Sequence, residues 1–256
     1  MATKISISNQ KGGIGKTTTA LNLATGLIKK GKRVLLVDTD PQRNSTRVYG
    51  AQVEGVATLA DIMYDGLSAA ECVQKAKLGD IIASDGALKT ADNKIEVDTN
   101  RFYHLSDAME KVEEQYDFII FDTPPGNGVL LGNVLSYADY VIIPVTCDSF
   151  GIQGLRDFYE TIGEYKKRIN RNLKIAGILR VKYKGRQNLT KDIEDNVLPA
   201  FAEEMNTVLF QTTIRESVKC QEAQTMQESL FKYAPDCTTA VDYEKFIDEL
   251  LIQIGG

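Results

Sequence analysis

A glycine-rich loop near the N-terminus constrains the fold of this chain more than any other stretch. Residues 11–18 read Lys-Gly-Gly-Ile-Gly-Lys-Thr-Thr and follow an alternating apolar segment that is typical of a β-strand. Residues 20–28 then place alanine, leucine and isoleucine at helical spacing. The order of strand, glycine-rich loop, Lys-Thr pair and helix is that of a phosphate-binding loop.

The residues of this loop suit a nucleoside triphosphate with Mg²⁺. Glycines let the backbone curl so that N–H groups point at the phosphates, and the start of the helix adds positive potential. Lys16 occupies the position that contacts the β- and γ-phosphates, and Thr17 supplies a hydroxyl ligand for Mg²⁺. The predicted nucleotide-binding residues are Lys11, Gly12, Gly13, Ile14, Gly15, Lys16, Thr17 and Thr18.

Short apolar strands alternate with helical segments along most of the chain. We expect strands at 4–9, 33–38, 117–122, 140–145 and 174–181, and helices at 18–30, 101–115, 130–137, 150–169 and 189–206. The stretch 51–100 is less regular, with a weaker helical pattern at 58–64 and a strand pattern at 80–84. Strands that are apolar on both faces favour a mostly parallel twisted sheet with helices on both faces. The sequence has no linker or repeat, so we predict a single α/β domain over 1–256.

The composition is that of a globular protein, with 43% hydrophobic residues. No apolar run approaches the ~20 residues that cross a bilayer, and the N-terminus opens into a strand instead of a signal peptide, so we expect a cytoplasmic location. The four cysteines are scattered without a Cys-x-x-Cys pair, which argues against zinc or an iron–sulfur cluster. The single histidine, His104, is expected to be structural.

Three aspartates fall where predicted strands end. In a parallel α/β sheet the ligand lies beyond the carboxyl ends of the strands, the expected position of Asp38, Asp40 and Asp122. Mg²⁺ would reconcile these carboxylates with the phosphates, held by Thr17 and by water that Asp122 orders, with Asp38 in support. For any one aspartate taken singly, a plain turn role stays open. Likewise, the segment 124–126, Pro-Pro-Gly, is either a switch loop that senses the terminal phosphate or an ordinary tight turn.

Charge is strongly segregated along the chain. The net charge is −5, yet residues 166–191 hold ten basic residues and no acidic one, which leaves 20 basic and 35 acidic residues elsewhere, a balance of −15. Such a patch suits nonspecific binding of the DNA backbone, and Lys182, Lys184 and Arg186 are its candidate contacts. A merely solvated basic face is the alternative.

The glycine-rich loop resembles that of the deviant Walker A ATPases, the ParA/MinD group, and the likeness extends over nearly the whole length. Segments 34–42, 118–126, 141–145 and 151–155 look like further strands and switch segments of the ParA family. The resemblance implies that Lys11 reaches across a nucleotide-sandwich dimer to the partner's phosphates, that Asp40 positions the attacking water, and that the nucleotide is ATP. Lys11, Lys16 and Asp40 are therefore the predicted catalytic residues, and Mg²⁺ would be held by Thr17, Asp38 and Asp122.

The same resemblance implies a partition ATPase for a plasmid or chromosome. An ATP-dependent homodimer would bind nonspecific DNA on the nucleoid, and a ParB-like centromere-binding partner would stimulate slow hydrolysis. Arg215 and Lys219 fall in the family's C-terminal DNA-contact segment, but Ser217 stands where the family has an asparagine near the adenine. One alternative is a MinD-like membrane ATPase, although residues 242–254 have an acidic polar face instead of a basic one. Another is an ATP-dependent biosynthetic ligase, but Lys11 argues against it, because a self-sufficient active site does not need a lysine directed at a partner.

Overall fold

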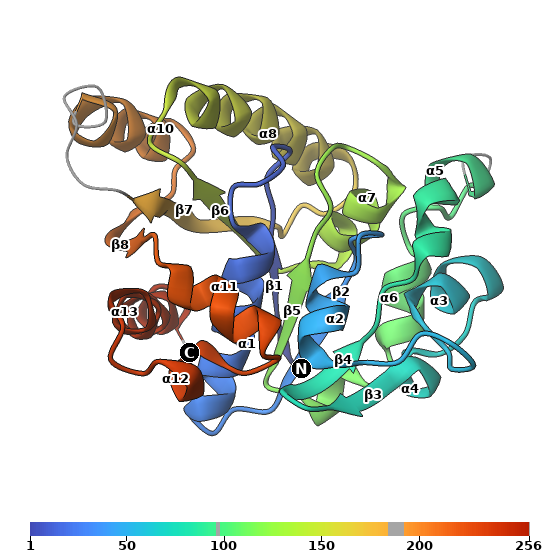
Figure 1. Cartoon of the computed structure of the whole chain (residues 1–256). Coiled ribbons are helices and arrows are strands. Elements are labelled where there is room, and N and C mark those ends of the chain that lie inside the picture. Colours follow the sequence, from blue (N-terminus) through green and yellow to red (C-terminus); the bar gives the residue numbers. More distant parts are fainter. Residues whose placement is uncertain (96–97, 184–191, 256) are drawn as a thin grey trace.

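The computed structural model describes residues 1–95, 98–183 and 192–255. These residues form an eight-stranded sheet in the order β3-β4-β2-β5-β1-β6-β7-β8, with helices on both faces (Figure 1). Neighbouring strands are parallel except for the pair β3–β4, which is antiparallel. The predicted α/β class with a mostly parallel sheet is confirmed.

The strands keep close to the predicted positions in the middle of the sheet and differ at its edges. Their bounds are β1 Thr3–Ile7, β2 Val34–Asp38, β3 Val73–Ala76, β4 Gly79–Ile82, β5 Phe118–Asp122, β6 Tyr140–Val145, β7 Lys174–Tyr183 and β8 Leu209–Arg215. The sequence did not predict β3 and β8. Both are edge strands of mixed polarity, which lack the continuous apolar run of a strand that is covered on two sides.

Helices cover both faces of the sheet. Their bounds are α1 Lys16–Lys29, α2 Asn44–Tyr49, α3 Leu59–Asp65, α4 Ala69–Cys72, α5 Ala91–Lys94, α6 His104–Met109, α7 Val129–Tyr137, α8 Ser149–Arg168, α10 Leu198–Glu204, α11 Val218–Thr225, α12 Leu230–Tyr233 and α13 Thr238–Ile254. The helix predicted over 101–115 is wrong in length, because the chain leaves α6 after Met109 and bends to bury Val112 and Tyr116. The first residues of the helix predicted over 189–206 lie outside the described residues, and within the described part a π-helical turn, Ile193–Val197, precedes α10.

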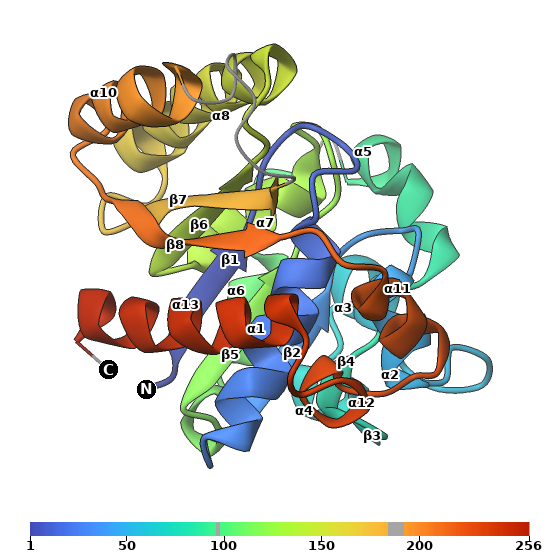
Figure 2. The same ribbon diagram turned by 60° about the vertical axis from the view of Figure 1, so that its left-hand side comes forward.

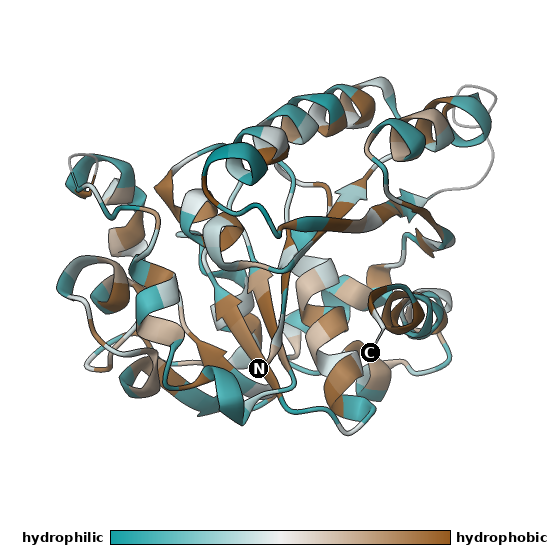
Figure 3. Cartoon of the chain, turned by 180° about the vertical axis from the view of Figure 1, so that it is seen from behind, coloured by the Kyte–Doolittle hydropathy of each residue, from teal (hydrophilic) through white to brown (hydrophobic). Residues whose placement is uncertain are grey.

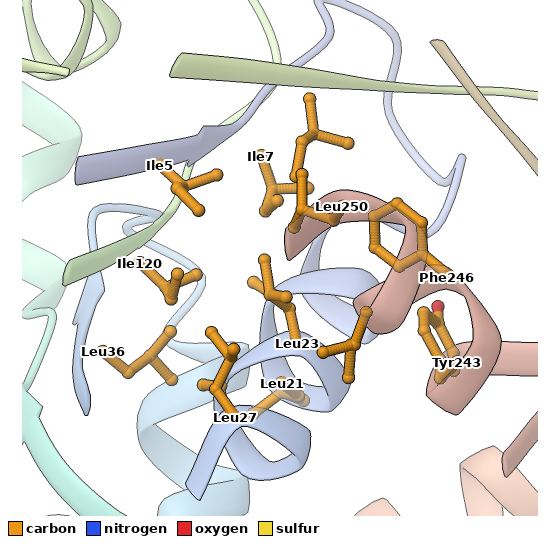
Figure 4. Close-up of a cluster of buried hydrophobic side chains, with 14 of the residues drawn as sticks. Ile5, Ile7, Leu21, Leu23, Leu27, Leu36, Ile120, Tyr243, Phe246 and Leu250 are labelled. Carbon is orange, nitrogen blue, oxygen red and sulfur yellow. The ribbon is translucent and has the colours of Figure 1, made fainter. Parts of the chain in front are cut away.

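Successive side chains of the central strands point to opposite faces of the sheet and pack against the helices there. Ile5 and Ile7 of β1 pack with α1 and α13, in the cluster that Figure 4 shows, whereas Leu35 and Val37 of β2 point to the helices of the opposite face. Seen from behind, the central strands are hydrophobic and the outer surfaces of the helices are largely polar (Figure 3). The sheet is therefore buried on both sides, as its apolar strands predict.

The last helix, α13, packs against α1, the helix that follows the glycine-rich loop, and covers the same face of the sheet. In α13, Tyr243, Phe246, Ile247 and Leu250 are buried, and α13 runs across α1 (Figure 2). The segment 242–254 therefore packs on the core through its apolar face. Among the described residues, no helix combines the length and apolar character needed to span a membrane.

Candidate functional site

The glycine-rich loop connects β1 to α1 at the carboxyl edge of the sheet. Gly13 and Gly15 have φ values of 73° and 88°, in the left-handed region that glycine adopts without strain. Gly15 precedes the first residue of α1, and no side chain caps this helix start. Helix α1 begins at Lys16, two residues before the prediction, so Lys16 and Thr17 lie on its first turn. The first N–H groups of α1 can therefore bind an anion.

Lys16 is buried beneath this loop, and its ammonium donates a hydrogen bond to the carbonyl oxygen of Lys11 at 2.8 Å. Burial lowers the pKa of Lys16, and the negative charges of Asp122 and Asp40 offset part of that effect. The two carboxylates thus favour the charged ammonium, which is the form of Lys16 that attracts a phosphate group.

Two of the predicted aspartates are fully buried and lie side by side. Asp38 ends β2 and Asp122 ends β5, and the two residues stand opposite each other in the parallel register. Burial first, and the charge of Asp38 second, raise the pKa of Asp122; burial also raises the pKa of Asp38. Two adjacent buried carboxylates repel each other when both are ionised, so a cation bound beside them would stabilise their charged forms.

Hydroxyl groups orient these carboxylates. Asp122 accepts hydrogen bonds from Thr17 Oγ1 at 3.3 Å and from Ser45 Oγ at 2.8 Å. Asp38 Oδ2 accepts from the main-chain N–H and the hydroxyl of Thr46 at 2.8 and 2.7 Å. Ser45 and Thr46 are not among the predicted site residues; the signal for them is the Asn-Ser-Thr triplet at 44–46, shortly after Asp38 and Asp40.

Asp40 lies on the segment that leaves β2 and lines the same cleft. Its Oδ1 atom accepts a hydrogen bond from the N–H of Gln42 at 2.9 Å, and its carbonyl oxygen accepts one from the hydroxyl of Ser84 at 2.7 Å. Ser84 follows β4, so Asp40 is held from two parts of the chain. The carboxylate has a defined position from which it could orient a water molecule.

An open cleft of about 650 Å³ joins these groups, a size in the range of small-molecule sites. The glycine-rich phosphate-binding loop at residues 11–18, or P-loop, and the segment after β2 form one part of its wall, and α11 forms another. The residues that line it are Gly12, Gly13, Gly15, Lys16, Thr17, Thr18, Asp40, Gln42, Asn44, Arg47, Val48, Pro125, Lys182, Gln221, Gln224 and Thr225. The contribution of α11 was not predicted from the sequence; in it, Gln224 donates a hydrogen bond to the hydroxyl of Thr18 at 3.2 Å.

The oxygen atoms of Thr17 and Asp122 fit a Mg²⁺ ion that is also bound by a triphosphate. Within 1–95, 98–183 and 192–255, no group of three histidine, cysteine, aspartate or glutamate side chains is arranged to hold a metal ion. Thr17 Oγ1 and Asp122 Oδ1 face each other at 3.3 Å beside the P-loop. Mg²⁺ prefers few protein ligands and completes its octahedron with water and phosphate oxygens.

Lys11 turns away from the cleft that its own loop forms. Its Nζ lies 3.4 Å from Asp148 Oδ1, at the start of α8, and 5.4 Å from the ring centroid of Phe150. Phe150 is 75% exposed, and Lys11 is not among the residues that line the cleft. The role of Lys11 toward a partner's phosphates stays a prediction.

The candidate DNA-binding residues that the structure describes are already engaged within the chain. Lys184 and Arg186 lie outside the described residues. Lys182 Nζ donates to the carbonyl of Gly13, at the P-loop, at 2.6 Å. Arg215, at the end of β8, binds Asp242 through its Nε and Nη2 atoms at 2.8 and 2.6 Å, and Lys219 binds Glu222 at 2.8 Å. Their DNA contacts stay predictions, and for Lys182 and Arg215 the contacts made within the chain compete with them.

Comparisons with known proteins find relatives that match most of the chain. A family model described as an AAA domain matches residues 2–175. The sporulation initiation inhibitor protein Soj of Bacillus subtilis is 34% identical over 234 residues, which cover 90% of this chain and 91% of Soj. The chromosome partitioning protein ParA of Caulobacter vibrioides is 31% identical over 252 residues, 96% of this chain and 93% of that protein.

A solved structure resembles the fold over its whole length. The crystal structure of cobyrinic acid a,c-diamide synthase from Mycobacterium smegmatis, with bound ADP and magnesium, has a TM-score of 0.84 and 26% identity. The match covers 100% of this chain and 96% of that one. The P-loop architecture described above is thus shared with a protein that holds ADP and magnesium.

Proposed function

The chain belongs to the ParA family of P-loop ATPases, and on that premise we propose that it hydrolyses ATP with Mg²⁺ to drive the partition of a plasmid or a chromosome. The main support is the likeness to Soj and ParA over nearly the full length of each protein. The buried pair Asp38 and Asp122 beside Lys16 and Thr17 supplies the chemistry that such hydrolysis needs.

Each site residue has a proposed task in this reaction. The N–H groups of the P-loop and the ammonium of Lys16 bind the phosphates, and Thr17 and Asp122 hold Mg²⁺ and its water shell, with Asp38 in support. Bound Mg²⁺ supplies charge neutralisation to the phosphate oxygens. Asp40, held by Gln42 and Ser84, positions the attacking water.

We propose further that ATP joins two copies of the chain into a sandwich dimer. The observation that carries this step is the position of Lys11, a P-loop lysine that does not line its own cleft and pairs only with a half-exposed carboxylate, Asp148, among described residues. An exposed ion pair of this kind stabilises by about 0–1 kcal/mol, so Lys11 can leave it at small cost and reach a partner's phosphates. Hydrolysis in each copy then depends on a cation from the other.

The dimer is proposed to bind nonspecific DNA, and a ParB-like centromere-binding protein is proposed to stimulate an otherwise slow hydrolysis. Doubling the basic surface raises DNA affinity, because each neutralised phosphate releases counterions. The candidate contacts are Lys184, Arg186, Arg215 and Lys219. This mode of action would place the protein on the nucleoid in the cytoplasm.

A biosynthetic ligase is the alternative, favoured by the likeness to cobyrinic acid a,c-diamide synthase. A MinD-like membrane ATPase is less favoured, since the apolar face of α13 is buried on the core. Co-sedimentation with DNA in the presence of ATP, ADP or no nucleotide separates these functions. The partition ATPase should pellet with DNA only with ATP, and Lys16→Ala should abolish this; a wild-type protein that ignores DNA under all three conditions would refute the proposal.

The variant Lys11→Ala tests whether Lys11 is required for the ATP-dependent dimer. It should bind ATP with nearly wild-type affinity but stay monomeric in analytical ultracentrifugation, because Lys11 does not line its own cleft. Retention of an ATP-dependent dimer by this variant would remove Lys11 from its proposed role.

A further inference from the structure

Lys182 adopts a backbone conformation that is uncommon for a residue with a side chain. It lies near the end of β7 with φ of 54°, in the left-handed region. The pairing of β7 with β8 slips here: Arg180 pairs with Thr213 and Tyr183 with Arg215, so three steps on β7 match two on β8. The extra residue forms a β-bulge, a device that turns a side chain away from its regular direction and recurs next to active sites.

The bulge brings the end of β7 against the P-loop at two points. Lys182 Nζ donates a hydrogen bond to the carbonyl oxygen of Gly13 at 2.6 Å, and the Lys182 side chain lines the nucleotide cleft. A Cβ atom on Gly15 would lie 3.9 Å from Val181 Cγ2. The local geometry therefore aims Lys182 at the phosphate site instead of outward from the sheet.

The contact with Gly13 resembles that of the established P-loop lysine. Lys16 Nζ also donates to a carbonyl of this loop, that of Lys11, at 2.8 Å. A main-chain carbonyl is a neutral acceptor, whereas hydrogen bonds from an ammonium to a charged phosphate oxygen are roughly twice as strong. A phosphate in the cleft would therefore compete well for both ammonium groups.

The position of Gly13 indicates that Lys182 would reach the terminal phosphate of a bound triphosphate. The neighbouring Gly12 faces Pro125, which belongs to the loop after Asp122, since a Cβ atom on Gly12 would lie 4.0 Å from Pro125 Cβ. The metal-side carboxylates mark the end of the cleft where the transferred phosphoryl group lies. Gln224 of α11 binds Thr18, farther along the P-loop from Gly13.

We propose that Lys182 is a phosphate-binding residue of the nucleotide cleft and contacts the terminal phosphate of a nucleoside triphosphate bound by its own chain. This inference rests on the proposed ATPase function and reassigns Lys182 from the predicted DNA surface. It adds an intramolecular cation to Lys16 and Arg47, which also line the cleft, whereas Lys11 is directed elsewhere. In sequence, Lys182 stands two residues before Lys184, so one short stretch would serve both nucleotide and DNA.

The test compares the affinities of a triphosphate and a diphosphate. Lys182→Met keeps the aliphatic stem and removes the ammonium; Lys174→Met, at the opposite end of β7, is the matched control, since Lys174 lies over the ring of Tyr140. Binding of fluorescent β,γ-imido-ATP and fluorescent ADP is measured with Mg²⁺. We expect Lys182→Met to weaken triphosphate binding about tenfold, as loss of a charge-assisted contact does, and ADP binding less than about twofold. Lys174→Met should change neither.

Lys182→Gly separates the loss of the ammonium from a folding defect. Glycine adopts the left-handed conformation freely, so the midpoint of thermal unfolding should equal or exceed that of the wild type. Triphosphate affinity should nevertheless fall as in Lys182→Met. Wild-type affinity in both variants would overturn the proposal, as would equal losses for the triphosphate and ADP. Lost DNA retention with unchanged nucleotide affinity would return Lys182 to the DNA surface. The ATPase function itself fails only if the wild-type protein binds β,γ-imido-ATP no better than Lys16→Ala.

Discussion

Replacing Asp122 by asparagine is expected to stabilise the nucleotide-free protein at neutral pH, even though Asp122 belongs to the proposed metal site. Asp122 is fully buried opposite Asp38, and burial followed by the charge of Asp38 raises the pKa of Asp122. The folded protein therefore keeps a proton that the unfolded chain releases above about pH 4. Stability gained from that proton is complete at low pH and is lost as the pH rises, by about 1.4 kcal/mol per pH unit for one proton.

Asparagine carries no titratable proton, and it can still pair with the hydroxyls of Thr17 and Ser45. The free energy of unfolding of Asp122→Asn, relative to the wild type, should thus grow by about 3 kcal/mol between pH 5.5 and 7.5. Urea unfolding followed by circular dichroism, in EDTA at three pH values, measures this difference. Asp65→Asn removes an exposed carboxylate and should show no such trend. A difference that does not change with pH would refute the reasoning, as would a variant less stable than the wild type at pH 7.5.

Three further predictions concern hydrolysis and packing. Asp40→Ala should retain ATP within about threefold of wild-type affinity and lose about 100-fold in phosphate release; normal turnover would exclude Asp40 from water positioning. Gly26→Ala should lower the free energy of unfolding by about 1–2 kcal/mol in urea, because its methyl group would overlap Ile247 of α13, whereas Gly163→Ala has open space and should not be destabilised. Asp242→Asn should cost about 1–3 kcal/mol in the same assay, since Asp242 is buried and accepts three hydrogen bonds from Arg215; unchanged stability would show that this pair contributes nothing.

The central strands and the P-loop were predictable because local pattern and tertiary environment agree there. β2, β5 and β6 are buried on both faces, so their apolar runs carry the signal of the strand directly, whereas β1 shows it through the alternation of polar and apolar residues. β8 could not be recognised in the same way, because it is an edge strand whose buried positions are only Phe210 and Ile214.

The contacts that orient the site depend on residues far apart in the chain, and this explains what the sequence did not reveal. Asp40 is held by Ser84 only because β4 pairs with β2. Likewise, a count of basic residues could not show that Asp242 engages Arg215, or that a bulge turns Lys182 to the P-loop. The charge pattern predicted a basic surface, whereas the pairing of its members follows from the tertiary fold.

The order of strands in the sheet has a consequence for synthesis of the protein on the ribosome. β1 lies between β5 and β6, so the strand that precedes the P-loop gains its first neighbour only after residue 122, and its second only after residue 145, has left the exit tunnel. At about 5–20 residues per second, that interval is on the order of 10 s. We therefore expect nascent chains that end before β5 to gain no protease protection from nucleotide, and arrested chains of increasing length would reveal where protection begins.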